Sequence, residues 1–272
     1  MSRASATAKL NLALVVGPLR ADGKHDVATV LQRLTLADRV DVSAGDGLTV
    51  EGFAQDTLVR AALTSLAIEA GVRPRWCARI TKRIPVAAGL GGGSSDAATA
   101  LRLANATLDQ PLPEDRLRKL ARALGADVPF FLANGPQLGE EEGGALTPLD
   151  FPQDYFVLLV VPHGAVKAAT GAVYDEFDRR GGGRGYDVRR AALLESVSAV
   201  ARPRDLAALP ANDLVSSPLA DELRDLGAFR ADVSGAGPTV YGLFQHRRAA
   251  VAARNRLRSR GRTWLTAPAW YA

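Results

Sequence analysis

A glycine-rich segment from Pro85 to Ala98, PVAAGLGGGSSDAA, has the composition of a phosphate-binding loop. Trp76 to Ile84, before it, is apolar and rich in β-formers, whereas Ala97 to Leu108, after it, is rich in alanine and leucine and is expected to be helical. The glycines therefore lie at a helix N-terminus, where free amide N–H groups and the helix dipole favour a bound anion. Glycine also lets the backbone approach a ligand closely and adopt positive φ angles. We therefore expect a phosphate at Gly89, Gly91, Gly92 and Gly93.

This loop differs from the common nucleotide-binding motifs. A Gly-x-x-x-x-Gly-Lys-Ser/Thr loop requires a Gly-Lys pair, and the one such pair, Gly23-Lys24, is followed by His25. A dinucleotide fingerprint does not fit either, because Ser94 and Ser95 replace its glycine spacing. The remaining alternative is a flexible Gly/Ser linker. The sharp change from strand to helix favours the anion site.

Three further residues have the types that phosphoryl transfer needs. Lys9 and Asn11 lie two residues apart in the expected strand Ala8–Val16, so both side chains leave the same face. A lysine in such an apolar strand either serves a ligand or lies on an exposed edge, and the sequence leaves both open. Asp127 precedes Val-Pro-Phe-Phe, so its carboxylate is expected to be partly desolvated, although an aspartate there also caps turns. A cation, a carboxylate and a phosphate cradle together suit phosphoryl transfer to an alcohol.

The composition favours a globular protein with substantial cores. The chain has 272 residues, 47% of them hydrophobic, which is enough for one large or two ordinary domains. No apolar run reaches the length of a membrane span and no secretory leader is recognisable, so we expect a cytoplasmic protein without membrane contact. Cys77 is the single cysteine, which excludes an internal disulfide and a cysteine-based zinc site.

The net charge of +5 raises the question of nucleic-acid binding. Arginines gather near the C-terminus, at Arg247, Arg248, Arg254, Arg256, Arg258, Arg260 and Arg262. They alternate with Ala, Val and Leu at helical spacing and no aromatic platform accompanies them, which is typical of a solvated helix face. We therefore expect no nucleic-acid partner.

Strand-like and helix-like segments alternate along the chain. The first part is expected to contain strands at Ala8–Val16 and Val27–Leu34, a short hairpin of Arg39–Ser43 with Leu48–Glu51, and a helix at Thr57–Glu69 that Asp56 caps and Gly71 ends. After the glycine loop we expect a helix at Pro113–Ala123 and mixed turns over Gly135–Pro152, with a solvated acidic run from Glu140 to Glu142. The later part is expected to contain a strand at Tyr155–Val161, a flexible stretch at Gly181–Gly185, a strand pair within Ala231–Phe244, and helices at Thr170–Arg180, Asp187–Ala201, Pro218–Leu226 and Arg248–Arg258.

Three separated segments are together more specific than any one of them. They are Ala8–Leu12 (AKLNL), the glycine loop, and Val233–Thr239 (VSGAGPT). In this order, and over nearly the whole chain, they resemble the GHMP kinase superfamily. The resemblance implies a two-domain α+β fold, with a ribosomal protein S5 domain 2-like N-terminal domain, a ferredoxin-like C-terminal domain and an active site in the cleft between them. We place the boundary in the turn-rich segment, which gives domains of residues 1–152 and 153–272.

The same resemblance implies ATP as co-substrate, Mg²⁺, and a role for each motif. Lys9 and Asp127 become the catalytic pair, with Asp127 accepting or orienting the hydroxyl proton and Lys9 stabilising negative charge. Ser95 is the expected magnesium contact. The residues implied to bind ATP are Pro85, Ala88, Gly89, Leu90, Gly91, Gly92, Gly93, Ser94, Ser95, Gly235 and Gly237.

Two segments narrow the resemblance further: Arg20–His25 (RADGKH) and Gly125–Phe131 (GADVPFF) are similar to those of a member that phosphorylates a cytidine diphosphate-linked polyol in isoprenoid precursor biosynthesis. The residues then implied to bind the substrate are Asn11, Lys24, His25, Thr170 and Tyr174. That member usually has a tyrosine where this chain has Lys24, so half of an aromatic sandwich around cytosine is missing and weaker cytidine binding is expected. The alternatives are a kinase of another alcohol, such as homoserine, and a nucleotide-binding regulator without catalysis. A monomer or homodimer is expected.

Overall fold

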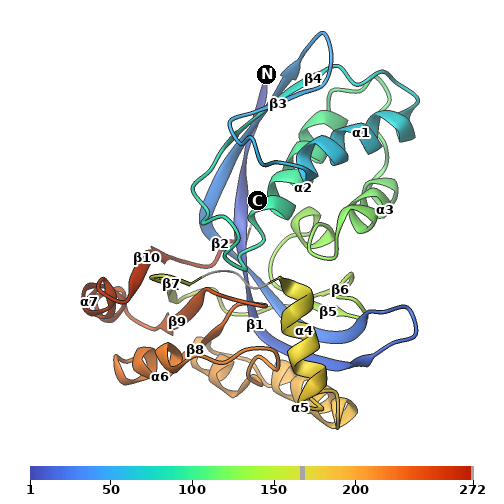
Figure 1. The fold of residues 1–272 in the computed structure, drawn as a ribbon. Coiled ribbons are helices and arrows are strands. Elements are labelled where there is room, and N and C mark those ends of the chain that lie inside the picture. The colour runs from blue at the N-terminus through green and yellow to red at the C-terminus, as the bar shows by residue number, and fades with distance from the viewer. Residues whose placement is uncertain (166–168, 271–272) are drawn as a thin grey trace.

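Two long antiparallel strands, β1 (Ser2–Leu19) and β2 (His25–Ala44), form a hairpin that runs through the molecule in the computed structural model (Figure 1). The structure describes residues 1–165 and 169–270. β2 also pairs with β4 (Trp76–Thr81) and with β5 (Gln137–Glu140). The six-stranded first sheet is completed by β3 (Thr49–Glu51), parallel to β4, and β6 (Ala145–Pro148), antiparallel to β5.

Helices α1 (Leu58–Ala70), α2 (Gly92–Asn105) and α3 (Glu114–Leu124) lie together beside the first sheet (Figure 1). The Asp56 carboxylate accepts backbone N–H groups from the first turn of α1 at 3.1 and 3.2 Å, and Gly71 ends this helix in the left-handed conformation, both as predicted. Buried side chains such as Leu66 of α1 and Leu101 of α2 share one apolar cluster with the sheet. This packing holds α1 and α2 against the sheet.

The second sheet has the strand order β10-β7-β9-β8, and every neighbouring pair in it is antiparallel. Its strands are β7 (Phe156–Pro162), β8 (Arg230–Val233), β9 (Val240–Phe244) and β10 (Gly261–Thr266). The remaining helices are α4 (Thr170–Arg179), α5 (Tyr186–Ser198), α6 (Pro218–Asp225) and α7 (Arg247–Leu257), with short 3-10 helices η1 (Pro129–Leu132) and η2 (Pro203–Ala208). Since α6 and α7 pack on this sheet, its β-α-β-β-α-β order is that of the predicted ferredoxin-like domain.

One apolar core joins the two sheets. It combines Leu10 and Leu12 of β1 with Leu159 of β7 and Tyr241 of β9, all fully buried. Each buried leucine stabilises the fold by about 1.5 to 3 kcal/mol relative to an exposed one, so the contact between the halves is strong. The architecture is the predicted two-domain α+β fold, while the boundary at residue 152 stays a prediction.

The predicted hairpin of Arg39–Ser43 with Leu48–Glu51 is wrong. Arg39–Ser43 belongs to the single long strand β2, and β3 pairs in parallel with β4 instead. Two aspartates of this part of β2 are buried in the strand: Asp38 binds the Lys82 ammonium, and Asp41 binds the Arg3 guanidinium. Partners more than 35 residues away in sequence therefore allow the strand to continue.

Four smaller expectations are also corrected. Helix α2 begins at Gly92 rather than Ala97, so two glycines and both serines form its first turn. The segment Gly135–Pro152 forms the β5–β6 hairpin, and Glu140 ends β5 with its carboxylate 3.0 Å from the Arg190 guanidinium instead of lying in a solvated loop. Within Gly181–Gly185, predicted to be flexible, Gly182 and Gly183 are closely packed, because a Cβ there would collide with Phe177 or Pro18 respectively. Strand β10 follows α7 where no strand was predicted.

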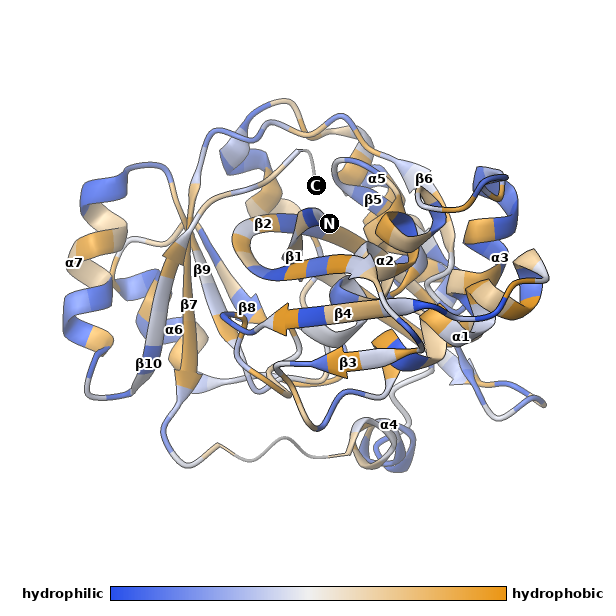
Figure 2. Cartoon of the chain, turned by 90° about the horizontal axis from the view of Figure 1, so that it is seen from above, coloured by the Kyte–Doolittle hydropathy of each residue, from blue (hydrophilic) through white to orange (hydrophobic). Residues whose placement is uncertain are grey.

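Helix α7 has the amphipathic character that the sequence predicted. Its inner positions Ala250, Ala253 and Leu257 are buried, while Arg247, Arg248 and Arg256 are exposed. Hydrophilic and hydrophobic residues accordingly alternate along it (Figure 2). Within residues 1–165 and 169–270, no helix is long and apolar enough to cross a membrane.

Candidate active site

The glycine loop leaves β4 and turns into α2 through backbone conformations that only glycine adopts easily. Gly89 and Gly91 have φ angles of 77° and 68°. A Cβ at Gly89 would lie 2.6 Å from the Ser234 carbonyl oxygen, and one at Gly91 would lie 2.9 Å from the Phe131 ring. The loop therefore combines left-handed turns with very close approach to two other segments, as a phosphate cradle at a helix N-terminus requires.

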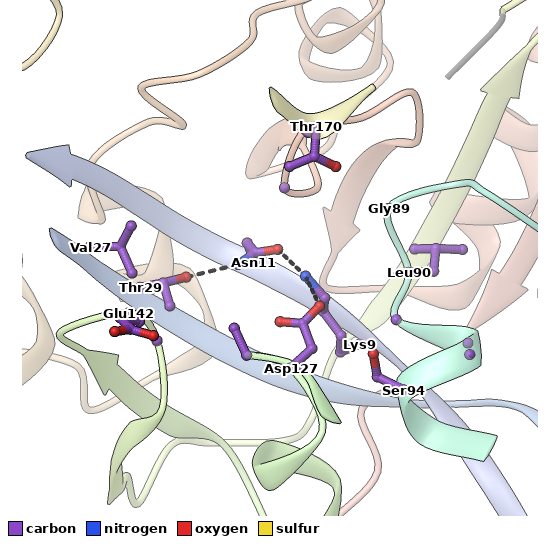
Figure 3. A pocket seen from close by; sticks show the side chains of 18 of the residues that line it. Lys9, Asn11, Val27, Thr29, Gly89, Leu90, Ser94, Asp127, Glu142 and Thr170 are labelled. Carbon is purple, nitrogen blue, oxygen red and sulfur yellow. Dashed lines mark hydrogen bonds and ion pairs between the residues drawn. The ribbon is translucent and has the colours of Figure 1, made fainter. Parts of the chain in front are cut away.

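Lys9 and Asn11 leave β1 side by side, and the Asp127 carboxylate lies beside the Lys9 ammonium (Figure 3). The Lys9 Nζ donates to Asn11 Oδ1 at 2.5 Å and lies 3.5 Å from Asp127 Oδ2. Asn11 Nδ2 donates to Thr29 Oγ1 at 2.9 Å, which orients the amide so that its oxygen faces the lysine. The Lys9 side chain is 6% exposed and that of Asp127 is 40% exposed, so a buried cation meets a carboxylate that opens to the cavity.

The third motif, Val233–Thr239, forms hydrogen bonds with the glycine loop and with β1. Ser234 Oγ donates to the Gly89 carbonyl oxygen at 3.0 Å and accepts the Asn11 backbone N–H at 3.4 Å. Thr239 Oγ1 donates to the Ala88 carbonyl oxygen at 2.6 Å. A Cβ at Gly235 would lie 3.2 Å from Asn11 Oδ1 and 3.6 Å from Lys9 Nζ. Three segments that are distant in sequence thus meet around the Lys9 ammonium.

A cavity of about 1380 Å³ joins these groups. Its lining includes these predicted site residues: Lys9, Asn11, Lys24, His25, Pro85, Ala88, Gly89, Leu90, Gly91, Gly92, Gly93, Ser94, Asp127, Thr170, Tyr174, Gly235 and Gly237. Ser95 is not among the lining residues, and its buried Oγ has no hydrogen-bond partner within the described parts of the chain. The structure therefore brings together every predicted site residue except Ser95.

The end of the cavity near the β1–β2 turn holds the residues predicted to bind cytidine. The rings of His25 and Tyr174 lie with centroids 4.8 Å apart, and His25 Nε2 is 3.0 Å from Asp178 Oδ1. Burial and the nearby Asp127 carboxylate raise the pKa of Tyr174 to about 12. Lys24 lines the same cavity, and its ammonium donates to Glu142 Oε2 at 2.6 Å in an exposed ion pair.

A buried ionic cluster beside the glycine loop was not predicted from the sequence. Lys82 Nζ binds both the Asp38 carboxylate and Asp96 Oδ2, the latter at 2.7 Å, while Asp38 accepts the backbone N–H groups of Arg83 at 2.5 Å and Ile84 at 2.8 Å. The cluster thereby fastens both ends of the loop to β2. Burial and the neighbouring Asp38 charge raise the pKa of Asp96 to about 7. The spacing of these residues gave no signal, since they come from three elements.

A glycine loop at a helix N-terminus, a lysine and an aspartate in one cleft between these two domains define a GHMP small-molecule kinase that uses ATP. Residues 57–135 match the model of the GHMP kinases N terminal domain, and residues 214–263 match that of the GHMP kinases C terminal domain. A 4-diphosphocytidyl-2-C-methyl-D-erythritol kinase of Geobacter sulfurreducens is 38% identical, with 96% of each chain covered. One from Nocardia farcinica is 39% identical over 91% of this chain and 86% of the relative. The chain belongs to the family of 4-diphosphocytidyl-2-C-methyl-D-erythritol kinases.

Solved structures agree with this assignment. A crystal structure of a 4-(cytidine 5'-diphospho)-2C-methyl-D-erythritol kinase superposes with a TM-score of 0.79 at 30% identity and covers 98% of this chain and 99% of that one. The mevalonate kinase of Methanococcus jannaschii superposes with a TM-score of 0.75 at 13% identity, covering 98% of both chains, and shows that the fold is shared.

Proposed function

We propose that this protein transfers the γ-phosphoryl group of ATP to the 2-hydroxyl of 4-diphosphocytidyl-2-C-methyl-D-erythritol, in the supply of isoprenoid precursors. The observation that carries the proposal is the Lys9–Asp127 pair facing the glycine loop in one cavity with the His25–Tyr174 ring pair. The family membership supports the substrate. Homoserine and other alcohols are thereby disfavoured, as is a regulator without catalysis, because both catalytic side chains are in place.

The reaction proposed is a direct in-line transfer. The substrate hydroxyl oxygen bonds to the γ-phosphorus while the bond from that phosphorus to the β–γ bridging oxygen breaks, so that ADP leaves with the bridging oxygen. Asp127 takes or orients the hydroxyl proton, and Lys9 stabilises the negative charge that spreads over the transferred group. The N–H groups of the loop and of the first turn of α2 hold the remaining phosphates.

Magnesium enters this proposal as part of the ATP complex. Among the residues that the structure describes, no group of three or more His, Cys, Asp or Glu side chains is placed to hold a metal ion. Mg²⁺ bound chiefly by phosphate oxygens and water needs only one or two protein ligands. We assign the protein contact to Ser94, which lines the cavity, rather than to the buried Ser95.

The test is a substrate panel. Purified protein is incubated with Mg²⁺·ATP and, separately, with 4-diphosphocytidyl-2-C-methyl-D-erythritol, homoserine, mevalonate or galactose, and ADP release is measured. Turnover of the cytidylyl substrate alone is expected. Turnover of another alcohol in preference to it contradicts the proposed substrate and leaves the fold assignment intact.

The expectations about partners accompany the proposal. We propose a monomer or homodimer that binds no nucleic acid. Light scattering checks the first point, and an anisotropy titration with DNA and RNA at physiological ionic strength checks the second. Sub-micromolar binding that depends strongly on salt contradicts the second expectation.

A further inference from the structure

Arg33 of β2 is the largest side chain that is fully buried in the described part of the molecule, with 1% of the residue exposed. No carboxylate of residues 1–165 or 169–270 forms an ion pair with it, and the cation of Arg102 acts on it unfavourably. Desolvation lowers the pKa of Arg33 to about 10, and its Nε has no hydrogen-bond partner among the residues that the structure describes. A buried, unpaired cation is costly, so its retention calls for a specific use.

The guanidinium group of Arg33 makes most of its contacts with one short element, η1, and the residue after it. Its Nη2 donates to the carbonyl oxygen of Phe130 at 3.0 Å and to that of Ala133, at the end of η1. The guanidinium carbon also lies 5.3 Å from the centre of the Phe130 ring and 5.5 Å from that of Phe131. The remaining donor, Nη1, reaches Thr7 Oγ1 on β1 at 3.2 Å. Arg33 therefore fastens η1 to the β1–β2 hairpin.

This element begins two residues after Asp127. The Val128 N–H donates to the Gly125 carbonyl oxygen at 3.1 Å and the Phe131 N–H donates to the Val128 carbonyl oxygen at 3.1 Å, so Asp127 and η1 form one hydrogen-bonded turn. A displacement of η1 consequently moves the carboxylate as well. The Lys9 ammonium, 3.5 Å away, is held separately by Asn11 and would not follow.

Arg33 also lies next to the other two parts of the site. Its Cα is paired with that of Lys9 across the β1–β2 ladder, so both side chains leave the same face of the hairpin. The ring of Phe131, over which the guanidinium lies, is the surface that the backbone of Gly91 approaches in the glycine loop. The Arg33 side chain therefore contacts η1, which follows Asp127 in the chain, and the Phe131 ring, against which the glycine loop packs.

We propose that Arg33 is a positioning residue for phosphoryl transfer, which sets the Asp127 carboxylate at its place opposite Lys9 by binding the two carbonyl oxygens of η1 and its aromatic rings. The proposal rests on the proposed role of Asp127. A guanidinium suits this task because its planar fork donates to two carbonyl groups while its face lies on aromatic rings, and a lysine ammonium does not do both. If stability alone were required, an apolar side chain of similar volume would serve as well or better.

The first experiment measures kcat and both KM values for Arg33→Met and Arg33→Lys. For Arg33→Met we expect kcat to fall by roughly 10- to 100-fold with each KM within about threefold, because a shift of about 1 Å in a catalytic group has an effect of this size. For Arg33→Lys we expect a smaller loss, since one carbonyl group keeps its donor. Leu66→Ala, which creates a cavity in the remote α1 core, is the control for lost stability and is expected to keep kcat within about twofold at a temperature where it remains folded.

Two outcomes overturn the proposal in this experiment. One is a kcat within twofold of the unaltered protein in folded Arg33→Met. The other is an equal loss of kcat in Leu66→Ala, which would mean that any destabilisation has the same effect. If Arg33→Met does not fold, Arg33→Lys and Arg33→Gln are compared in its place, and a kcat unchanged in both contradicts the proposal.

The second experiment separates this proposal from the proposed role of Asp127. Arg33→Met is measured alone, in the background of Asp127→Asn, and against Asp127→Asn alone, at enzyme concentrations high enough to follow residual turnover. If Arg33 acts through Asp127, the second substitution lowers kcat by less than about twofold further. If the two losses multiply in full, Arg33 acts elsewhere and the proposal is wrong. If Asp127→Asn alone keeps its kcat, the assignment of Asp127 fails, which is a different result.

Discussion

The two ends of the cavity are built in different ways. At the end with Lys9 and Asp127, the groups proposed for chemistry are carried by a strand and a helix start, and Lys9, Asn11 and Ser234 are buried and hydrogen-bonded to one another. At the other end His25 is buried, but the contact of Lys24 is exposed: Lys24 pairs with Glu142, and their side chains are 58% and 40% exposed. Buried, connected polar groups lose much when one is changed, whereas exposed ion pairs contribute about 0 to 1 kcal/mol.

This difference explains where the chain departs from its resemblance. The replacement of an aromatic residue by Lys24 occurs at the exposed end, where a long side chain finds a partner in Glu142 without disturbing the fold. The groups at the buried end are those of the sequence motifs. Lys9 and Asn11 share a hydrogen bond of 2.5 Å, and a Cβ at Gly91 or Gly235 would lie 2.9 to 3.6 Å from their side chains, so each limits what its neighbours can be. We therefore expect substitutions among the catalytic residues to lower kcat strongly, and substitutions at Lys24 to be tolerated with changes in the KM for the cytidine substrate.

The largest effect is expected at the buried cation. Lys9→Met keeps the volume of the side chain and removes its charge, so the developing negative charge on the transferred group loses its stabilisation. We expect kcat to fall by about 10² to 10³ with a normal thermal unfolding midpoint. Steady-state kinetics and a melting curve check this, and a kcat within tenfold of the unaltered enzyme would break the contrast between the two ends.

The second-largest effect is expected for substitutions in the glycine loop. Gly89→Ala places a Cβ 2.6 Å from the Ser234 carbonyl oxygen at a positive φ angle, so the loop must move away from the third motif. We expect the KM for ATP to rise by roughly 10-fold or more. Gly93→Ala is the matched comparison, because its Cβ would meet only Leu58 Cδ1 at 3.5 Å, and we expect a clearly smaller rise. Equal effects of the two substitutions would contradict the close-approach explanation.

At the end of the cavity near Lys24, one substitution is expected to strengthen substrate binding. Lys24→Tyr restores an aromatic surface beside His25 and Tyr174, and stacking on a base contributes about 1 to 3 kcal/mol. The KM for the cytidine substrate is expected to fall by roughly 5- to 100-fold with kcat unchanged. Lys24→Ala, which breaks the pair with Glu142 without adding a ring, is expected to change KM little. An unchanged or raised KM in Lys24→Tyr contradicts the idea that half of the stack is missing.

The buried cluster of Lys82, Asp38 and Asp96 predicts a modest pH dependence of stability. Burial and Asp38 raise the pKa of Asp96 to about 7, above its value in the unfolded chain. The folded protein therefore binds more protons than the unfolded chain between about pH 4 and 7, and stability falls as pH rises through this window. Relative to Asp96→Asn, the free energy of unfolding of the unaltered protein should fall by roughly 1 to 3 kcal/mol from pH 5 to pH 8. Urea denaturation at both pH values measures this, and a constant difference contradicts it.

Much of the fold and most of the site were predictable because their signals are local. The glycine run marks a helix N-terminus by composition, Lys9 and Asn11 share a strand face by their spacing of two, and Asp56 with Gly71 marks the ends of α1. Each of these signals lies within a few residues of the structure that it predicts.

The features that the sequence did not predict depend on partners that are distant in the chain. Asp38 gave no signal because its partner Lys82 is 44 residues away, and Arg33 gave none because it binds carbonyl groups, whose positions no residue type reveals. The strand β10 depends on pairing with β7, about a hundred residues earlier in the chain. Charged residues in an otherwise apolar strand are therefore better taken as buried pairs when a partner exists elsewhere than as a break in the strand.

The most direct test of the central claim, that the chemistry belongs to the buried end of the cavity, is the kcat of Asp127→Asn with saturating Mg²⁺·ATP and cytidylyl substrate. The carboxamide keeps the size of the side chain and removes its charge and basicity. A kcat lowered by about 10² or more, with both KM values little changed, is the predicted result. A variant that keeps more than about a tenth of kcat would show that Asp127 does not act as the proton acceptor in this reaction.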